Sequence, residues 1–331
     1  MKKAVITALF SLFLASALPT VAYAQELFVG GQVVGIQIST EGVMVAGVAQ
    51  VETTEGVCSP AAEAGIKEGD FITEIDGRKV NSAKELIDGV GSRCGERVAL
   101  TVVRGDKNLS LNIQPVKSAE DQWMLGMWLR DGVSGIGTVT YCDPSTGIYG
   151  ALGHSISDFD TGIMVPLSQG SITDAEVIGI TKGAAGAPGE LNGCADLGKV
   201  LGSVLGNTDH GIYGRVYTAL GGQLVETGKI CVGRASIVST INGREAQEYQ
   251  VEINRVYKDA NGEHVVLTVT DPDLCAQTGG IVQGMSGSPI LQNGKLVGAV
   301  THVFVNDPTR GYGISIQDML DDAGLTVQSA A

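Results

Sequence analysis

The stretch GMSGSP, residues 284–289, places one serine where nucleophilic chemistry is feasible. Gly284 and Gly287 flank Ser286 and remove side chains that would crowd an approaching substrate. In a Gly-x-Ser-Gly pattern we expect the first serine to be the nucleophile. The backbone N–H groups of Gly284 and Ser286 would then form the oxyanion hole. The same residue types also build plain tight turns between strands, so the stretch alone leaves both interpretations open.

A serine nucleophile needs a neighbouring base, and one of the four histidines is well placed for it. His154 lies in YGALGHSISD, where an expected strand runs into a glycine-flanked histidine and then a polar turn. A base at the rim of a strand has open space before it and can reach a substrate. His264 is predicted to be solvated in a polar turn, His302 to pack behind a buried strand, and His210 is ambiguous. His154 is therefore the predicted general base, with a structural role as the alternative.

The second half of the chain must position these residues, and its pattern is that of antiparallel strands. Beyond Pro115, apolar and small residues alternate, with turn signals about every 8 to 12 positions. Residues 265–269 form a β-branched run, and Asn293-Gly294 is a strong hairpin signal between two strands. Only residues 317–323 have a helical pattern. These features predict an antiparallel sandwich or barrel.

The first half of the chain, residues 28–117, has a different pattern of short strands and two short helices. In SPAAEAGIKEGDFITEIDGRKV, Pro60 opens a helix and Gly65 closes it. A strand at 71–75 and the hairpin signal Asp76-Gly77 follow. This segment closely resembles the core of a bacterial PDZ domain.

The PDZ resemblance implies a peptide-binding module. Such domains bind an extended peptide, often a C-terminus, by adding it as a strand at a sheet edge. Carried over by position, the carboxylate-binding loop is residues 30–35, followed by the receiving strand. The implied peptide-binding residues are Gly31, Val34, Gly35, Ile36 and Ile38. The alternative is a PDZ domain that serves only as a rigid brace.

The order of the two candidate catalytic residues, His154 before Ser286, is that of the two-barrel serine proteases. The segments IYGALGHSISDFDTG and TDPDLCAQTGGIVQGMSGSPILQNGKLVGAVTHVFVNDPTRGYGISI, with the PDZ-like module before them, resemble the SpoIVB (stage IV sporulation protein B) peptidase family. The resemblance implies a mainly β protein. An α+β PDZ domain at 28–117 would precede a chymotrypsin-like antiparallel β-barrel peptidase domain at 118–331.

The same resemblance implies a Ser-His-Asp triad and hence a serine endopeptidase that needs no metal and no organic cofactor. Ser286 would be the nucleophile, His154 the general base and Asp271 the orienting acid. Asp271 lies only 15 residues before Ser286 and directly precedes a proline, where capping a turn is the commoner role of aspartate. Asp158 and Asp160, shortly after His154, are the competing acids.

Members of the resembled family are exported peptidases of sporulation signalling. The implied substrate is a membrane-associated regulator of an intramembrane protease, whose cleavage activates the late mother-cell sigma factor. One rival is an envelope quality-control protease that degrades unfolded exported proteins. A rival from another class is a non-catalytic scaffold that acts through its PDZ domain alone.

The N-terminus predicts export across the cytoplasmic membrane. Lys2 and Lys3 precede an apolar run over residues 4–18, and Ala22-Tyr23-Ala24 has the small-residue pattern of a cleavage site. Residues 1–24 are either a cleaved signal peptide or a retained anchor, and the anchor would be the only membrane contact. By resemblance, the location is the space between the forespore and mother-cell membranes.

Charge and cysteine spacing exclude several other functions. The formal net charge of −14 gives no electrostatic support for binding nucleic acid. The six cysteines lie 36 to 52 residues apart, which excludes the close spacing of zinc or redox motifs. They could form up to three disulfides, such as Cys58–Cys94, or remain buried free thiols.

Overall fold

The computed structural model describes residues 25–218 and 220–325 of the 331-residue chain. The expected export segment at residues 1–24 lies outside the described residues. The described chain is mainly β, as predicted, and its helices are only 4 to 10 residues long. No helix in these ranges is both long and apolar enough to cross a membrane. All six cysteines fall within the described ranges and are unpaired.

The first barrel is a ring of six antiparallel strands. Each strand pairs with the next, and pairing between the second strand, β11, and the first strand, β2, closes the ring. The strands in ring order are β2 (Val33–Val48), β11 (Met127–Cys142), β12 (Ile148–Ala151), β15 (Gly211–Val216), β14 (Glu190–Thr208) and β13 (Leu167–Thr181). Strand β1 (Glu26–Val29) pairs with β11 and with β16 (Leu224–Glu226). Fully buried Tyr149, Ile172 and Ile212 fill the interior.

The second barrel is also a closed ring of six strands. In ring order these are β17 (Gly233–Ser239), β18 (Gln247–Asp259), β19 (Gly262–Val269), β22 (Asp307–Ser315), β21 (Lys295–Phe304) and β20 (Pro289–Gln292). The predicted hairpin is confirmed: Asn293 and Gly294 both have positive φ and join β20 to β21. The predicted helix is α5 (Ile316–Asp322). A second helix, α4 (Pro272–Thr278), was not predicted.

The PDZ unit has its own core and contains the helices and hairpin that the sequence predicted. Its elements are β3 (Val51–Thr53), β4 (Gly56–Cys58), α2 (Pro60–Glu63), β5 (Phe71–Ile75), β6 (Arg78–Lys79), α3 (Ala83–Ser92), β7 (Val98–Arg104), β8 (Lys107–Ile113), β9 (Val116–Lys117) and β10 (Trp123–Met124). Ser82 caps α3 by accepting from the Glu85 N–H. Apolar side chains from β5, α3 and β7 form the core. Arg104 holds the buried Asp70 carboxylate at 2.6 Å.

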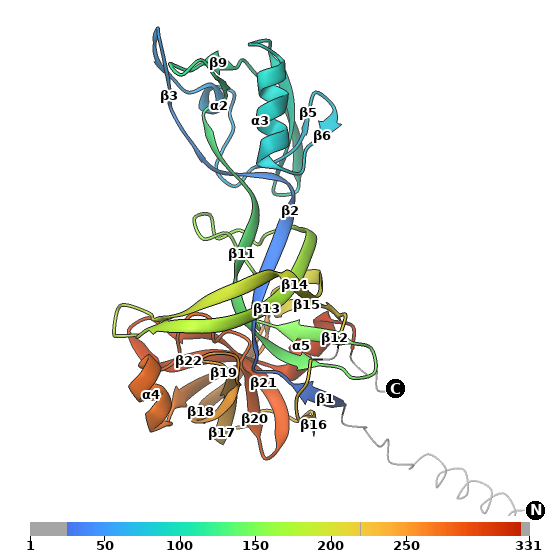
Figure 1. The fold of residues 1–331 in the computed structure, drawn as a ribbon, viewed down its shortest axis with the longest axis vertical. Coiled ribbons are helices and arrows are strands. Elements are labelled where there is room, and N and C mark those ends of the chain that lie inside the picture. Colours follow the sequence, from blue (N-terminus) through green and yellow to red (C-terminus); the bar gives the residue numbers. More distant parts are fainter. Residues whose placement is uncertain (1–24, 219, 326–331) are drawn as a thin grey trace, which may run out of the picture.

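The PDZ unit is inserted between two strands of the first barrel (Figure 1). Strand β2 pairs with β11 and β13 over residues 34–39, and then continues to pair with β5 of the PDZ unit at Val43 and Met44. Strand β11 returns from the PDZ unit to the barrel beside it. Residues 26–40 therefore belong to the peptidase barrel. The expected division into 28–117 and 118–331 does not follow this structural boundary, because the barrel is built from both sides of the insert.

Candidate active site

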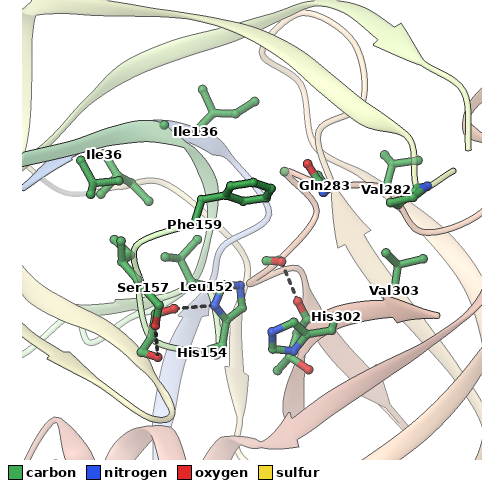
Figure 2. A pocket seen from close by; sticks show the side chains of 18 of the residues that line it. Ile36, Ile136, Leu152, His154, Ser157, Phe159, Val282, Gln283, His302 and Val303 are labelled. Atoms are coloured by element: carbon green, nitrogen blue, oxygen red, sulfur yellow. Dashed lines mark hydrogen bonds between the residues drawn. The ribbon is translucent and has the colours of Figure 1, made fainter. Parts of the chain in front are cut away.

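The two barrels meet around one cavity, with a volume of about 740 Å³, that contains both candidate catalytic residues. His154 follows strand β12 of the first barrel, and Ser286 lies in the loop before β20 of the second. The structure thus brings together two residues that lie 132 positions apart in the sequence. Figure 2 shows His154 beside His302, with the apolar side chains of Ile136, Phe159 and Val282 around them.

The loop that carries Ser286 fits against the first barrel only because residue 287 is glycine. Gly287 has φ +94°, and a Cβ there would lie 2.1 Å from the Thr138 carbonyl oxygen and 2.4 Å from the Leu152 nitrogen. Thr138 also holds the loop: its Oγ1 donates to the Gly284 carbonyl (2.9 Å) and its N–H to the Ser286 carbonyl (3.1 Å). The position of Ser286 therefore depends on contacts between the two barrels.

The predicted oxyanion hole has two free donors. Among the described residues, no hydrogen-bond acceptor meets the N–H of Gly284 or of Ser286. The N–H groups of the residues that follow each of them are bonded instead. Met285 donates to the Val282 carbonyl at 3.1 Å, and Gly287 donates to the Val300 carbonyl at 2.8 Å. Two unpaired N–H groups beside a serine hydroxyl can stabilise the negative charge of a tetrahedral intermediate. This arrangement agrees with the predicted role of Gly284 and Ser286.

The hydroxyl of Ser286 is not yet aligned with the base. Its Oγ donates to the Thr301 carbonyl oxygen at 2.6 Å. Rotation about χ1 moves a serine hydroxyl between staggered positions at small cost, and substrate binding commonly tightens catalytic hydrogen bonds. Ser288, the second serine of the stretch, is fully buried and donates to the Ser239 hydroxyl at 3.0 Å. Of these two serines, Ser286 lines the cavity and Ser288 does not.

His154 is held in the neutral form and tautomer that a general base requires. Its Nδ1 contacts the Ser155 carbonyl oxygen at 2.8 Å, so Nδ1 carries the proton and Nε2 is free to accept one. The His302 ring lies 4.5 Å away, centroid to centroid, at an interplanar angle of 35°. Burial, and secondarily the charge of His302, lower the pKa of His154 to about 4. At neutral pH the imidazole is therefore uncharged.

The structure does not join Asp271 to His154. Asp271 is the N-cap of α4, and its carboxylate accepts from the N–H groups of Asp273 (3.0 Å), Leu274 (3.1 Å) and Gln250 (3.2 Å). It is absent from the residues that line the cavity. The capping alternative is the one observed, because an aspartate directly before a proline at the first helical position is well suited to an N-cap. The expectation that Asp271 orients the histidine is therefore contradicted.

The two competing acids are also committed elsewhere. One Asp158 oxygen accepts from the Thr161 N–H and hydroxyl, both at 3.0 Å, and the other is bonded to Arg130. Burial alone would raise the pKa of Asp158, yet the hydrogen bonds from Thr161 and Arg130 outweigh it and hold the pKa below its usual value. Asp160 pairs with the same guanidinium at 2.8 Å. Both carboxylates therefore stabilise the loop after His154, and neither is bonded to the His154 imidazole.

The peptide-binding residues that were carried over by position are wrong. Over residues 34–39, strand β2 pairs with β11 on one edge and β13 on the other, so no edge remains to receive a peptide. Val34, Ile36 and Ile38 point into the core of the first barrel. A Cβ on Gly35 would lie 2.5 Å from Ala195 Cβ, and one on Gly31 would lie 2.6 Å from Val238. Four of these residues belong to the first barrel, and Gly31 packs against Val238 of β17 in the second.

The groove of the PDZ unit lies instead between α3 and the first residues of β11. Within the described residues, Met127 to Arg130 pair with β2 on one edge only. The groove has a volume of about 790 Å³ and is largely apolar, with exposed Ile87 (58%) and Trp128 (69%) on its walls. The receiving strand follows the rest of the PDZ unit in the sequence rather than preceding it. The run WMLGMWL, residues 123–129, was the available signal, since it is too apolar for a linker.

Among the described residues, no group of three or more histidine, cysteine, aspartate or glutamate side chains is arranged to hold a metal ion. The cavity instead combines a serine hydroxyl, a neutral imidazole and two free N–H groups. Two antiparallel six-stranded barrels with these groups between them define the class of two-barrel serine peptidases.

The chain belongs to the SpoIVB peptidase S55 family, whose model matches residues 121–320. A PDZ domain model matches residues 34–114. Both matches confirm the resemblance seen in the sequence, and with them the mainly β fold and the class of PDZ-containing serine endopeptidases.

More distant similarities cover single regions of the chain. A "Probable periplasmic serine endoprotease DegP-like" of Brucella suis is 37% identical over 79 residues, which are 24% of this chain and 15% of that protein. A protein of Xylella fastidiosa named as a zinc metalloprotease is 33% identical over 73 residues, 22% of this chain and 16% of that protein. This chain thus spans about a sixth of the length of each relative.

Two solved structures are also similar. The PDZ domain of an SdrC-like protein of Listeria monocytogenes is 30% identical, with a TM-score of 0.23, and the match covers 28% of this chain and 90% of that chain. The active form of the Rv3671c protease from M. tuberculosis is 14% identical, with a TM-score of 0.35, and the match covers 60% of this chain and 79% of that chain.

Proposed function

We propose that this chain is an exported serine endopeptidase of sporulation signalling. It would cleave a membrane-associated regulator of an intramembrane protease, so that the late mother-cell sigma factor becomes active. Membership of the SpoIVB peptidase S55 family supports this role. The observation that carries the catalytic part is the shared cavity of His154 and Ser286, with the free N–H groups of Gly284 and Ser286 beside them.

The proposed reaction is acyl transfer to Ser286 followed by hydrolysis. Ser286 Oγ attacks the scissile carbonyl while His154 Nε2 takes its proton, and the oxyanion accepts from the N–H groups of Gly284 and Ser286. The imidazolium then donates its proton to the leaving amine. Water, deprotonated by His154, releases the acyl group and restores the serine. Before attack, Ser286 Oγ must exchange its bond to the Thr301 carbonyl for one to His154.

The cavity walls favour an apolar substrate segment. Ile136, Val282 and Val303 line the cavity, and its described lining contains no lysine or arginine to pair with an acidic residue. The groove between α3 and β11 would bind a second, extended segment of the same substrate or of another protein. We place the enzyme on the outer face of the cytoplasmic membrane, in the space between forespore and mother cell, either released or anchored through residues 1–24.

The apolar cavity also favours the quality-control alternative, because unfolded proteins expose apolar segments. The two functions differ in substrate range. Comparison of new peptide termini in a spore-forming host, with wild type and Ser286→Ala, distinguishes them. A single cleaved membrane protein supports signalling, whereas many cleaved exported proteins and rapid casein hydrolysis support quality control. A non-catalytic scaffold would produce no new termini.

The catalytic assignment is tested by fluorophosphonate labelling of the purified chain. We expect label on Ser286, none in Ser286→Ala, and retained label in Ser288→Ala, because Ser288 is buried outside the cavity. Loss of the nucleophile should lower turnover by about 10⁶-fold. Label that persists in Ser286→Ala and disappears in a folded Ser288→Ala variant would contradict the assignment.

A further inference from the structure

The most exposed large apolar side chain in the described part of the chain lies at the active-site cavity. Phe159 is 95% exposed to solvent, well above the next most exposed, Trp128 at 69%. Single exposed apolar side chains are common on protein surfaces and need no explanation by themselves. Phe159, however, lines the cavity that contains His154 and Ser286. An aromatic ring left in water beside these residues is in a position to contact the substrate.

The loop that carries Phe159 is fixed on both sides of the ring. The side chain of the preceding residue, Asp158, is fully buried, and its carboxylate is bonded to Arg130 and to the N–H and hydroxyl of Thr161. The carboxylate of the following residue, Asp160, pairs with the same guanidinium at 2.8 Å. The backbone at Phe159 is therefore held in place, while its ring is left free in solvent.

The base of the loop is anchored to the first barrel and to the PDZ unit. Asn207 of β14 accepts from the Ile156 N–H at 2.8 Å and donates to the carbonyl oxygens of Ile156 (2.8 Å) and Val165 (3.0 Å). On the returning arm, Ile163 packs against the PDZ unit, since a Cβ on Gly69 would lie 2.5 Å from Ile163 Cδ1. An aromatic side chain on a fixed backbone loses little conformational entropy when a partner covers it. The loop is thus prepared for a contact that the free chain does not make.

The rest of the cavity wall is largely apolar and comes from both barrels. Figure 2 shows the Phe159 ring over the cavity, with Ile136 of the first barrel and Val282 of the second among the lining side chains. Val305, another lining residue, is also 52% exposed. A peptide segment that enters the cavity to reach Ser286 comes between these walls and the ring. An apolar side chain of that segment would be covered by both.

A lipid surface is a less suitable partner for this ring than a peptide. The chain has a formal net charge of −14, and the described lining of the cavity contains no lysine or arginine. Helices and loops that bind membrane surfaces commonly add basic residues that pair with anionic lipids. The two acids on either side of Phe159 have the opposite charge.

We propose that Phe159 is a specificity-determining residue, whose ring closes over an apolar side chain of the substrate near the scissile bond. This inference rests on the proposed serine peptidase function and adds the side chain that selects the substrate. Closure needs only rotation of the ring about its side-chain torsions, because the backbone is already fixed. It removes the ring and the substrate side chain from water together. Burial of a phenylalanine side chain corresponds to a factor of about 10 to 100 in kcat/KM.

The test compares variants of the purified full chain on two kinds of substrate. The ester p-nitrophenyl acetate acylates the serine without a peptide for the ring to cover. A peptide library from a digested bacterial proteome, with cleavage sites read by mass spectrometry, reports selectivity. Phe159→Ala should lower kcat/KM for the preferred peptides by about 10- to 100-fold and leave ester hydrolysis, fluorophosphonate labelling and the melting temperature unchanged. Tyr217→Ala, which removes a 65% exposed ring outside the cavity lining, should change none of these.

A change in selectivity separates substrate contact from a structural role. Phe159→Lys should shift the preference at one position of the cleavage sites from apolar to acidic side chains, because an ammonium group replaces the ring. Phe159→Leu should keep the apolar preference with a smaller loss of kcat/KM than Phe159→Ala. A defect in the loop itself would instead lower turnover of every substrate, the ester included, and leave the cleavage pattern unchanged.

Three outcomes would contradict the proposal. A wild type that neither labels nor hydrolyses either substrate overturns the serine peptidase function and this proposal with it. An active wild type whose Phe159→Ala and Phe159→Lys variants keep its rates and its cleavage pattern overturns the role of Phe159 alone. Sedimentation with phosphatidylglycerol vesicles gives the third: binding that Phe159→Ala abolishes, with unchanged peptide cleavage, would assign the ring to a membrane surface instead.

Discussion

Lowering the pH should destabilise this protein through His154 by an amount that follows from its environment. Burial, aided by His302, lowers the pKa of His154 to about 4 in the folded state, against about 6.5 when unfolded. Between these values the unfolded chain binds a proton that the folded chain does not. Stability therefore falls as the pH drops from about 6.5 towards 4.

The magnitude is set by the difference between the two pKa values. A shift of about 2.5 units at about 1.36 kcal/mol per unit predicts a loss of about 3 kcal/mol between pH 7 and pH 4 from this one residue. His302, whose pKa is also lowered by burial, adds a loss of the same sign. A loss of this size is a large fraction of the stability of a typical domain.

Urea denaturation of the wild type and His154→Gln at several pH values measures this effect. Titration of the carboxylates is common to both chains and cancels in the difference. The wild type should lose about 3 kcal/mol more than His154→Gln between pH 7 and pH 4. Equal pH dependence in the two chains would refute the reasoning, because it would mean that His154 titrates normally in the folded state.

His210 provides a control with the opposite sign. Burial alone would lower its pKa, yet the Asn261 carbonyl and the Asp322 carboxylate raise it above the usual value. The stabilisation from these partners is complete below the unfolded pKa and disappears as the pH rises through the folded pKa. His210→Gln should therefore cost more stability at pH 5.5 than at pH 8, whereas His154→Gln should show the reverse trend.

Two further predictions concern the insert and the ion pair at its base. Deleting residues 28–117 should abolish folding and probe labelling, because it removes strands of the first barrel. A second variant replaces residues 45–129 by Asn-Gly, which joins Met44 to its strand partner Arg130 and should keep both the fold and the labelling. Circular dichroism measures the fold, and the fluorophosphonate probe measures the labelling. Arg130→Gln leaves the Asp158 side chain, which is fully buried, without its cation and should cost about 3 kcal/mol in urea unfolding. Lys84→Gln, which removes one partner of a solvent-exposed pair, should leave the unfolding midpoint almost unchanged.

The local sequence was sufficient to select Ser286 and His154 as the candidate nucleophile and base, because the chemistry proposed for them requires local features. Glycines around Ser286 are needed for the turn itself, as the contacts of Gly287 with Thr138 and Leu152 show. His154 stands at a strand end, which alternation and glycine spacing predict. The same holds for the Asn293-Gly294 hairpin and for the helix opened by Pro60. In each case the cause lies within a few residues.

The acid could not be chosen in this way, because it depends on which strand lies beside His154. Asp271, Asp158 and Asp160 were chosen by resemblance or by nearness in the chain, and all three carboxylates are already bonded to caps, turns or Arg130. Strand β12, which leads into His154, pairs with β15. That pairing is a long-range choice, made by burying Tyr149 and Ile212 in one barrel.

The PDZ unit shows the same division between local pattern and tertiary pairing. Its helices and its hairpin were predictable from local signals, and so was its identity as a PDZ domain. Its groove was not, because a local pattern does not show which strand edge stays unpaired, and the strand carried over by position, residues 33–38, differs from the one beside the groove, residues 127–130. The first is enclosed by β11 and β13 in the barrel, while the second has one free edge beside α3. The sequence alone determined which residue types could do the chemistry; strand pairing decided which of them meet, because a sheet edge is free or occupied only in the assembled fold.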